Sequence, residues 1–344
     1  MLTLNLIRIL ILSTLSFTLA IIFTPVLTHF LYKYKLGKHI RNSGNTPIYS
    51  KLHEKKKGTP TLGGILVWGT MILIILFFYL CHLWQLEYLK DFNFLNRAQT
   101  LLPLGALVFC AGIGLIDDII DLRNPKGGGI RLWHRLLIFL VIALAGALWF
   151  YFKLDWDVLH IPFYGDLVIH WWYIPVFILI IVATSFSVNE TDGLDGLAGG
   201  TLLIAFLAYG VISFSIGRYD LAAFCGVLSG ALLAFLWFNI YPARFIMGDT
   251  GSMSLGVTLG IIALLTNQAL LLPIIGFIFV LESASVIIQI ISKRVFKRKV
   301  FLSAPIHHHF EATGWPEPKI VMRFWIIAAV MAILGLILFL LDKQ

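Results

Sequence analysis

The sequence predicts an all-α integral membrane protein of about ten transmembrane helices, from its composition, the length of its apolar segments and the placement of its charges. Hydrophobic residues make up 59% of the 344 residues and charged residues only 13%, whereas about 25% of a soluble domain is charged. Several apolar segments approach or exceed the roughly 20 residues that a helix needs to cross a bilayer. Basic residues gather in alternate loops between them. We therefore expect a single polytopic domain over residues 1–344.

Apolar segments separated by polar breaks are the expected transmembrane helices. The first, residues 4–32, is long enough to remain as a span instead of being removed as a signal peptide. The others cover residues 61–85, 99–117, 133–152, 171–188, 196–217, 220–239, 251–267, 270–293 and 322–341. Residues 153–170 mix aromatic and aliphatic side chains with Asp, Pro and Gly, which is typical of a small β-hairpin.

Lysine and arginine are distributed unequally between alternate loops. Residues 33–60, 118–135, 244 and 293–323 contain eight, four, one and seven of them, which is most of the 26 in the chain. Basic loops stay on the cytoplasmic side of a membrane. We therefore expect both termini to face outward and every polar motif described below to face the cytoplasm.

Charge and cysteine usage narrow the function further. The formal net charge of +8 comes mostly from these basic loops. It favours acidic lipids or phosphate-bearing substrates, and no nucleic-acid-binding module is recognisable. Cys81, Cys110 and Cys225 are scattered through apolar sequence, without the spacing of a disulfide framework, metal site or redox pair. We assign the three cysteines to packing.

A pair of aspartates, Asp117 and Asp118, ends the apolar segment at 99–117. A carboxylate inside a bilayer costs roughly 2.5 to 3.5 kcal/mol on insertion scales, so such residues indicate a functional site. Adjacent helical residues point about 100° apart. The two should therefore have different tasks, one acting on a reacting group and the other contacting a metal or orienting its neighbour. The alternative is a solvated helix end that also includes Asp121.

The segment NETDGLDGLAGG, residues 189–200, carries Asn189, Asp192 and Asp195 at three-residue spacing. If the segment is helical, the three form one polar face. The glycines allow tight turns and close approach of the backbone to a ligand. This pattern suits a nucleotide or a hydrated magnesium ion, which usually takes one or two carboxylates plus substrate phosphates. The alternative is a plain turn between spans.

The segment NIYPARFIMGDTGS, residues 239–252, contains one acid, Asp249. The small residues that follow it are expected to begin a helix, whose terminal N–H groups attract phosphate. A Gly-Asp pair near a membrane also suits an intramembrane aspartyl protease, with Asp117 or Asp118 as the partner of Asp249. The Asp-Thr-Gly-Ser string by itself does not indicate a pepsin-type enzyme, because that requires paired β-domains.

Two further segments suit a phosphate-bearing substrate. In PIHHHFE, the neighbouring side chains of His307, His308 and His309 diverge, which disfavours tetrahedral zinc. Imidazoles that donate to phosphate or sugar oxygens fit better. In KKKGTPTLGG, residues 55–64, three lysines adjoin hydroxyl side chains, although lysines here are also ordinary topology signals. Gln289 and Glu282 add polar groups inside the span at 270–293.

The segments KKKGTPTLGG, GLIDD, NETDGLDGLAGG, MGDTGS and PIHHHFE, in this order and over almost the whole chain, resemble the phospho-N-acetylmuramoyl-pentapeptide-transferase family. The resemblance implies ten spans in the bacterial cytoplasmic membrane. It also implies transfer from UDP-N-acetylmuramoyl-pentapeptide to undecaprenyl phosphate with Mg²⁺, which yields lipid I and UMP for peptidoglycan synthesis. Relatives that transfer N-acetylglucosamine phosphate to the same lipid are the alternative. A homodimer is compatible with the resemblance.

The resemblance also assigns roles to individual residues. Asp117 would deprotonate or position the lipid phosphate, Asp118 would support it, and Asp249 would bind magnesium. With these three, His308 is the other expected catalytic residue. The expected substrate-binding residues are Lys57, Thr59, Thr61, Asn189, Asp192, Asp195, Asn239, Gln289, His307 and His309, of which Asn239 and Gln289 would lie near the uridine.

Both the mechanism and the rival functions stay open at this point. Direct attack by the lipid phosphate and a phospho-enzyme formed on a carboxylate are both compatible with the residues. A secondary transporter would place its polar site near the bilayer midplane and often shows internal repeats, whereas the polar residues here gather at one face.

The chain also departs from the family pattern. It has Ile246 where a phenylalanine is usual, and Trp133-His134-Arg135 where a lysine is expected, which leaves the diphosphate-binding cation open.

Overall fold

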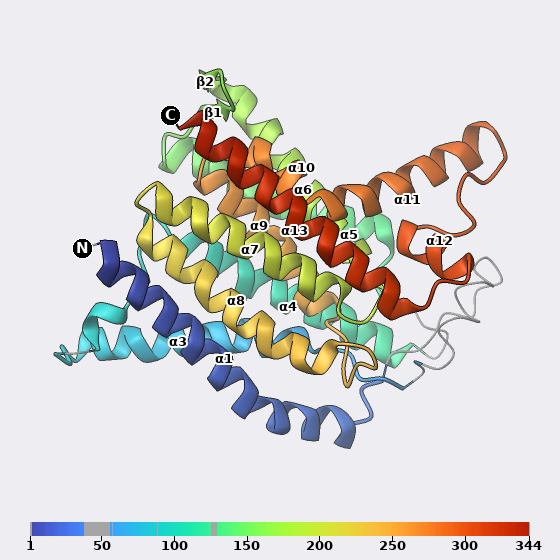
Figure 1. Ribbon diagram of the computed structural model, residues 1–344, viewed down its shortest axis with the longest axis horizontal. Coiled ribbons are helices and arrows are strands. Elements are labelled where there is room, and N and C mark those ends of the chain that lie inside the picture. Colours follow the sequence, from blue (N-terminus) through green and yellow to red (C-terminus); the bar gives the residue numbers. More distant parts are fainter. Residues whose placement is uncertain (1, 38–55, 57, 88, 125–128, 344) are drawn as a thin grey trace.

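A computed structural model describes residues 2–37, 56, 58–87, 89–124 and 129–343, and these fold into a bundle of long helices (Figure 1). Three short 3₁₀ helices, η2 (Lys90–Phe92), η3 (His170–Trp172) and η4 (Ala269–Leu271), lie between them. The α-helices are α1 (Leu2–Lys33), α3 (Gly64–Leu83), α4 (Leu101–Arg123), α5 (Leu132–Lys153), α6 (Tyr173–Thr191), α7 (Leu197–Ser215), α8 (Tyr219–Asn239), α9 (Asp249–Leu265), α10 (Leu272–Ile275), α11 (Phe277–Val295), α12 (Ile306–Ala312) and α13 (Glu317–Asp342).

The predicted all-α membrane fold is confirmed. Eight helices in the described part of the chain are long and apolar enough to cross a membrane. The expected span at 251–267 corresponds to α9, which has 17 residues, the lower end of a spanning length. The expected span at 270–293 corresponds to α10 and α11, which are bent by 81° relative to each other and do not form one continuous helix. The break falls at Gly276, whose backbone is not helical.

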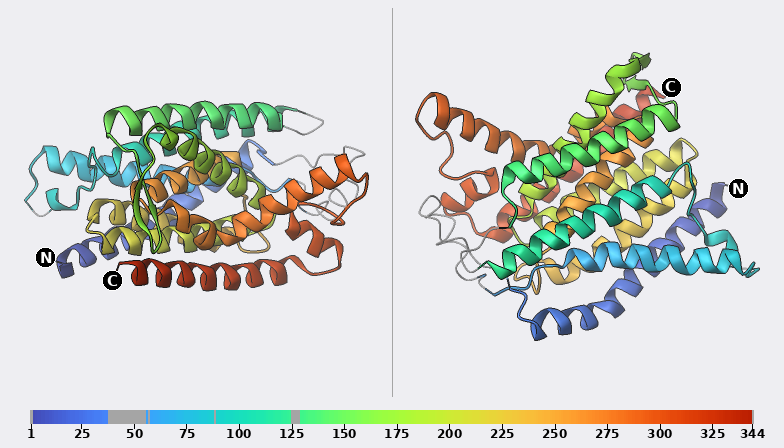
Figure 2. Two further views of the ribbon diagram at one scale, coloured as in Figure 1. Left: turned by 90° about the horizontal axis from the view of Figure 1, so that it is seen from above. Right: turned by 180° about the vertical axis from the view of Figure 1, so that it is seen from behind.

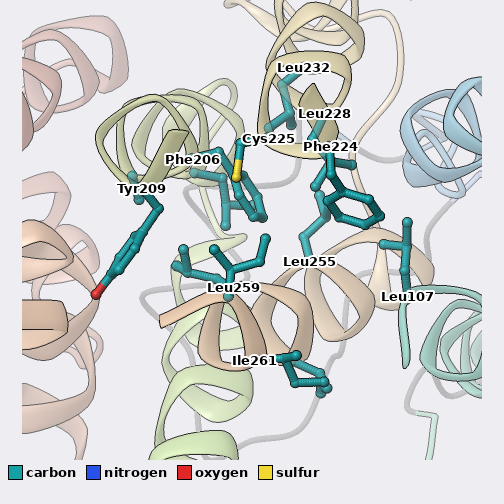
Figure 3. Packing of buried hydrophobic residues seen from close by; sticks show 14 of the residues in the cluster. Leu107, Phe206, Tyr209, Phe224, Cys225, Leu228, Leu232, Leu255, Leu259 and Ile261 are labelled. Carbon is teal, nitrogen blue, oxygen red and sulfur yellow. The ribbon is translucent and has the colours of Figure 1, made fainter. Parts of the chain in front are cut away.

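Helix α9 forms the centre of the bundle. Every residue from Thr250 to Leu265 is buried, with α4 packed on one side and α6 on another. Figure 3 shows Leu255 pointing toward Phe224 of α8. Glycines allow the close approach, since a Cβ at Gly256 would come within 2.9 Å of the α6 backbone. Small residues are the usual means of packing helices in membranes.

The remaining helices surround this centre. Helix α1 packs on α8 and α3, while α13 packs on α7. In the left view of Figure 2, α5 and α13 run along opposite sides of the bundle. Helix α11 projects from the bundle (Figure 1), and Ile287 and Ile291 on it are about half exposed. Such apolar surface is expected to face lipid.

The predicted hairpin is present as strands β1 (Val158–Ile161) and β2 (Gly165–Val168), paired antiparallel. It lies at the same end of the molecule as the C-terminus (Figure 1). The N–H of Phe163 donates to Asp342 at the end of α13, and the N–H of His160 donates to Asn267 after α9. The hairpin thus ties two helix ends together, at the end of the bundle opposite α12.

Candidate active site

The predicted polar residues meet at the end of the bundle where α4 and α6 finish and α9 begins. Asp117 and Asp118 lie near the end of α4, Asn189 lies in the last turn of α6, and Asp249 is the first residue of α9. Arg135, in the first turn of α5, reaches the same point. Helices that are separate in the sequence therefore bring three acids, an amide and a guanidinium into contact.

Asp118 caps the helix that carries Asp249. Its two carboxylate oxygens accept the backbone N–H groups of Asp249 (3.1 Å) and Thr250 (2.9 Å). The hydroxyl of Thr61 donates to Asp118 at 3.3 Å. The first N–H groups of a helix have no partner within it and carry partial positive charge, so a buried carboxylate is stabilising there. Asp118 therefore fixes where the side chain of Asp249 emerges.

Arg135 joins the other two carboxylates. Its Nε lies 2.7 Å from Asp117 Oδ2, and its Nη2 lies 2.8 Å from Asp249 Oδ2. Its Nη1 donates to Asn189 Oδ1 at 3.0 Å. Asp117 is fully buried, and a buried charge is strongly unfavourable unless it is paired. The guanidinium thus supplies the counter-charge that lets two carboxylates stand close together.

The loop before α5 completes the surroundings of Asp117. The backbone N–H of Ile130 donates to Asp117 Oδ1 at 2.5 Å. A Cβ on Gly129 would collide with the same carboxylate oxygen, so a residue without a side chain is required at this close approach. The sequence motifs do not include Gly129, because its contact with Asp117 depends on how the loop folds back and leaves no local signal.

Asn189 orients Asp249. Its amide nitrogen donates to Asp249 Oδ1 at 2.6 Å and to Ser252 Oγ at 2.9 Å, while its oxygen faces Arg135. With the cap from Asp118, this fixes both the backbone and the side chain of Asp249. A site held by packed helices and by hydrogen bonds from neighbouring groups is preorganised for catalysis.

The polar face expected for the segment at 189–200 does not form. Helix α6 ends at Thr191, so Asp192 and Asp195 lie in a turn, in which Gly196 adopts a left-handed conformation (φ +82°). Asp192 accepts the N–H of Gly248 at 3.0 Å, and Asp195 accepts that of Ala243 at 3.0 Å. Both acids therefore hold the loop that leads into α9.

Asn239 performs a similar task from the other side of this loop. It accepts the N–H of Gly196 at 3.0 Å and donates to the carbonyl of Phe245 at 2.8 Å. Gln289, also expected near the uridine, instead accepts the N–H groups of Val300 and Phe301, both at 3.0 Å. The structure thus brings Asn239 to the turn at 192–196 and Gln289 to the loop before α12.

A partly buried ion triad joins two of the predicted segments, 55–64 and 189–200, to the start of α13. The Lys56 ammonium lies 2.7 Å from Asp195 Oδ1 and 2.5 Å from Glu317 Oε1, and Glu317 also accepts the N–H of Asp195 at 2.6 Å. Burial alone would lower the pKa of Lys56, but the carboxylates of Glu317 and Asp195 outweigh it and raise the pKa above its usual 10.5. Sequence reasoning missed Glu317, which stands in no motif.

The other residues expected from the KKKGTPTLGG segment are placed differently. Lys57 lies outside the described residues. Thr59 is half-buried, and its N–H donates to the carbonyl of Lys56. Thr61 is buried and contacts Asp118. The segment therefore reaches the carboxylates through Thr61 and the 192–196 turn through Lys56.

The three histidines lie on α12 and point to different partners. His307 Nδ1 lies 2.8 Å from Glu282 Oε2, and both residues are fully buried. His308 Nδ1 lies 2.6 Å from Glu311 Oε2, and His309 Nδ1 accepts the N–H of Leu302.

Helix α12 contacts the turn at 192–196 through His307. A Cβ on Gly193 would collide with His307 Nε2, so the absent side chain allows this close contact. His307 therefore joins α12 to the segment at 189–200.

The donor set at Asp117 and Asp249 is compatible with magnesium. No group of three or more His, Cys, Asp or Glu within the described ranges is arranged to hold a metal by itself. Mg²⁺, however, usually keeps several waters and takes only one or two carboxylates plus substrate phosphates. Two carboxylates that already share one cation, Arg135, meet that requirement.

Comparison with known proteins agrees with the motifs. Residues 100–267 match the model of glycosyl transferase family 4. The chain is 39% identical to the phospho-N-acetylmuramoyl-pentapeptide-transferase of Chloroflexus aggregans, over 96% of this chain and 89% of the relative. Relatives of the same name from Geobacillus sp. (strain WCH70) and Thermodesulfovibrio yellowstonii are 38% and 37% identical, over 94% of this chain and 95% and 90% of their own length.

Proposed function

This chain belongs to the phospho-N-acetylmuramoyl-pentapeptide-transferase family, and on that premise we propose that it joins UDP-N-acetylmuramoyl-pentapeptide to undecaprenyl phosphate. The products are lipid I and UMP, as peptidoglycan synthesis requires. The observation that carries the proposal is the contact of Asp117 and Asp249 with one guanidinium, that of Arg135, at one end of a transmembrane bundle. That arrangement suits a reaction between two anions at a membrane face.

The reaction needs positive charge more than covalent help. A lipid phosphate oxygen attacks the phosphorus attached to the sugar, and the bond from that phosphorus to the UMP oxygen breaks. Positioning and charge stabilisation dominate such phosphoryl transfers. Mg²⁺ bound at Asp249 would neutralise the diphosphate and the leaving UMP. We assign the second cation, left open by the sequence, to Arg135, because a guanidinium binds phosphate oxygens in a bidentate manner.

Asp117 is proposed to position the lipid phosphate and to accept its proton. In the structure its oxygens contact the N–H of Ile130 and the side chain of Arg135. When Arg135 turns to the diphosphate, the second oxygen becomes available to the acceptor. Asp118, whose two oxygens hold the first turn of α9, supports the site and does not contact substrate.

The alternative reading as an intramembrane aspartyl protease is disfavoured by the same cluster. Aspartic proteases share a proton between two carboxylates about 3 Å apart. Here a guanidinium lies against both Asp117 and Asp249, whereas the shared-proton pair of an aspartic protease contains no such cation. The protease would also leave the turn at 192–196 and helix α12 without a function.

The chain is a multi-pass membrane protein, and we propose that the carboxylate end faces the cytoplasm of a bacterium, with both termini in the periplasm. The basic segments at 118–135 and 293–323 adjoin that end. UDP-linked sugars are made in the cytoplasm, which matches this orientation.

The proposal is tested by UMP release from detergent-purified protein. Donor, polyprenyl phosphate and magnesium are each omitted in turn, and UDP-N-acetylglucosamine replaces the donor in a parallel series. We expect release only when all three components and the muramoyl donor are present. Release without lipid would indicate a phospho-enzyme, and a preference for UDP-N-acetylglucosamine would assign the chain to the related transferases.

A further inference from the structure

A concave surface lies between α4 and α5, in the half of the bundle away from the carboxylates. Helices α4 and α5 follow each other in the chain, but α4 packs on α9 and α5 packs on α6. A cavity of about 370 Å³ opens between them, which is within the range of ligand pockets. Its floor includes Phe177 and Ile181 of α6 and Val257 and Ile261 of α9.

Small residues on both walls keep this α4–α5 groove open. Gly105 and Ala106 line it on α4, and Ala145 and Gly146 line it on α5. A Cβ on Gly105 would have nothing within 4 Å, so the space beside this residue is empty of protein. The lining is almost entirely apolar, and α5 runs along the outside of the bundle (Figure 2). A lipid chain can therefore enter the groove from the side.

One cation lines the mouth of the groove. Arg97, just before α4, is exposed and belongs to the lining. It makes no hydrogen bond or ion pair with the described residues. Trp149, also in the lining, is 45% exposed near the end of α5. Tryptophan and arginine at the end of an apolar span mark the level of lipid headgroups.

From this geometry we propose that the α4–α5 groove binds an anionic glycerophospholipid, with one acyl chain between α4 and α5 and the phosphate on Arg97. The charge at the mouth selects an anionic headgroup, and the apolar walls bury the chain. The lining contains no Asp or Glu, so a symmetric second copy of the chain would offer Arg97 no carboxylate from the same surface.

The bound lipid is distinct from the lipid acceptor of the reaction. Leu101, at the start of α4, and Asp117 are separated by 16 residues of helix, or about 24 Å at 1.5 Å per residue. A phosphate on Arg97 cannot reach the carboxylates across that distance. The groove is therefore a structural lipid site, and its occupancy is independent of the proposed transfer reaction.

The test is native mass spectrometry of the detergent-purified protein, titrated with phosphatidylglycerol or phosphatidylethanolamine. Wild-type protein should bind one phosphatidylglycerol about fivefold more tightly than phosphatidylethanolamine, the preference expected from one basic residue. Arg97→Gln should abolish the preference, and Arg97→Lys should keep it. Gly105→Leu should remove the bound lipid.

Gly112→Leu is the matched control, because Gly112 lies on the same helix, is exposed and also has nothing within 4 Å of its Cβ. It should bind lipid as wild type does, and UMP release by all four variants should show that they are folded. Equal binding of phosphatidylglycerol by wild type, Arg97→Gln and Gly105→Leu would overturn the proposal. The proposal would also be overturned if the wild-type protein were a dimer and Gly105→Leu made it monomeric while the lipid stayed bound.

Discussion

At the scale of single residues, the side chain that most determines the site is Arg135. It is the cation that Asp117 and Asp249 share, and Asp117 is fully buried. Removing one partner of a buried ion pair is strongly destabilising, because the other charge is left without compensation. The same cation is proposed to hold the diphosphate. Both the stability and the activity of the protein should therefore depend on Arg135, and suitable variants can separate the two effects.

We expect Arg135→Gln to lower kcat/KM for UMP release about 100-fold, the loss typical of one charge-stabilising group, and to lower the melting temperature. Arg135→Lys should retain part of the activity and part of the thermal stability, since lysine keeps the positive charge but cannot make the bidentate contact of a guanidinium. Adding Asp117→Asn to Arg135→Gln should restore the melting temperature but not the activity. If the double variant were as unstable as Arg135→Gln alone, the ion pair of Arg135 with Asp117 would not be the source of the lost stability.

At the scale of elements, the contact between α4 and α9 sets the position of the carboxylates. A Cβ on Gly114 of α4 would collide with the carbonyl oxygen of Asp249 and come within 2.6 Å of Thr250 Cα. Backbone atoms cannot move aside as a flexible side chain can. The two helices would therefore have to separate, which would weaken the cap that Asp118 provides.

Gly114→Ala is accordingly expected to lower both the melting temperature and UMP release, by about 10-fold or more. Gly112→Ala, two residues away on the same helix, is its control. There a Cβ meets nothing within 4 Å, and alanine favours a helix over glycine by roughly 1 kcal/mol. The melting temperature and the UMP release of the two variants test this prediction. Equal values for Gly114→Ala and Gly112→Ala would contradict the close contact between α4 and α9.

The hairpin at the opposite end should make stability depend on pH. His160 lies between Asp166 (2.6 Å) and Asp342 (2.5 Å). Partial burial lowers the pKa of His160, but its hydrogen bonds to the carboxylates of Asp342 and Asp166 outweigh this effect and raise the pKa above 6.5. Because the folded pKa exceeds the unfolded one, the contribution to stability is complete below about pH 6.5 and is lost as pH rises through the higher folded value.

The melting temperature of wild type should therefore fall between pH 6 and pH 8.5 by more than that of His160→Gln. His170→Gln is the control, since His170 is 72% exposed in its pair with Asp157, and it should keep the wild-type pH profile. Parallel profiles for wild type and His160→Gln would mean that the hairpin contact contributes nothing.

At the scale of the whole molecule, the sequence predicted the class of fold well, because length and apolar composition are local properties that the bilayer converts directly into helices. The bend between α10 and α11 was missed because residues 270–293 read as one apolar run. Pro273 and Gly276 stand inside it, and such residues are tolerated in transmembrane helices, so their presence alone does not predict a break.

The residues of the site were predictable as a set, but not their individual tasks. Asp118 caps a helix that begins 131 residues later in the chain, and Glu317 meets Lys56 across 261 residues. No local pattern records such contacts. Asp195 and Asn239 were expected to contact substrate, and the structure shows them holding backbone groups of the surrounding loops. Their part in substrate binding remains a prediction.

The most direct test of the account is the rate of UMP release by Asp249→Asn beside wild type, with muramoyl donor, polyprenyl phosphate and magnesium all present. Asparagine keeps the size of the side chain and an acceptor for Asn189, but removes the charge that Arg135 contacts and magnesium would require. We expect a fall in kcat of about 1,000-fold in a variant that still melts cooperatively. A folded Asp249→Asn protein that releases UMP at the wild-type rate would contradict it.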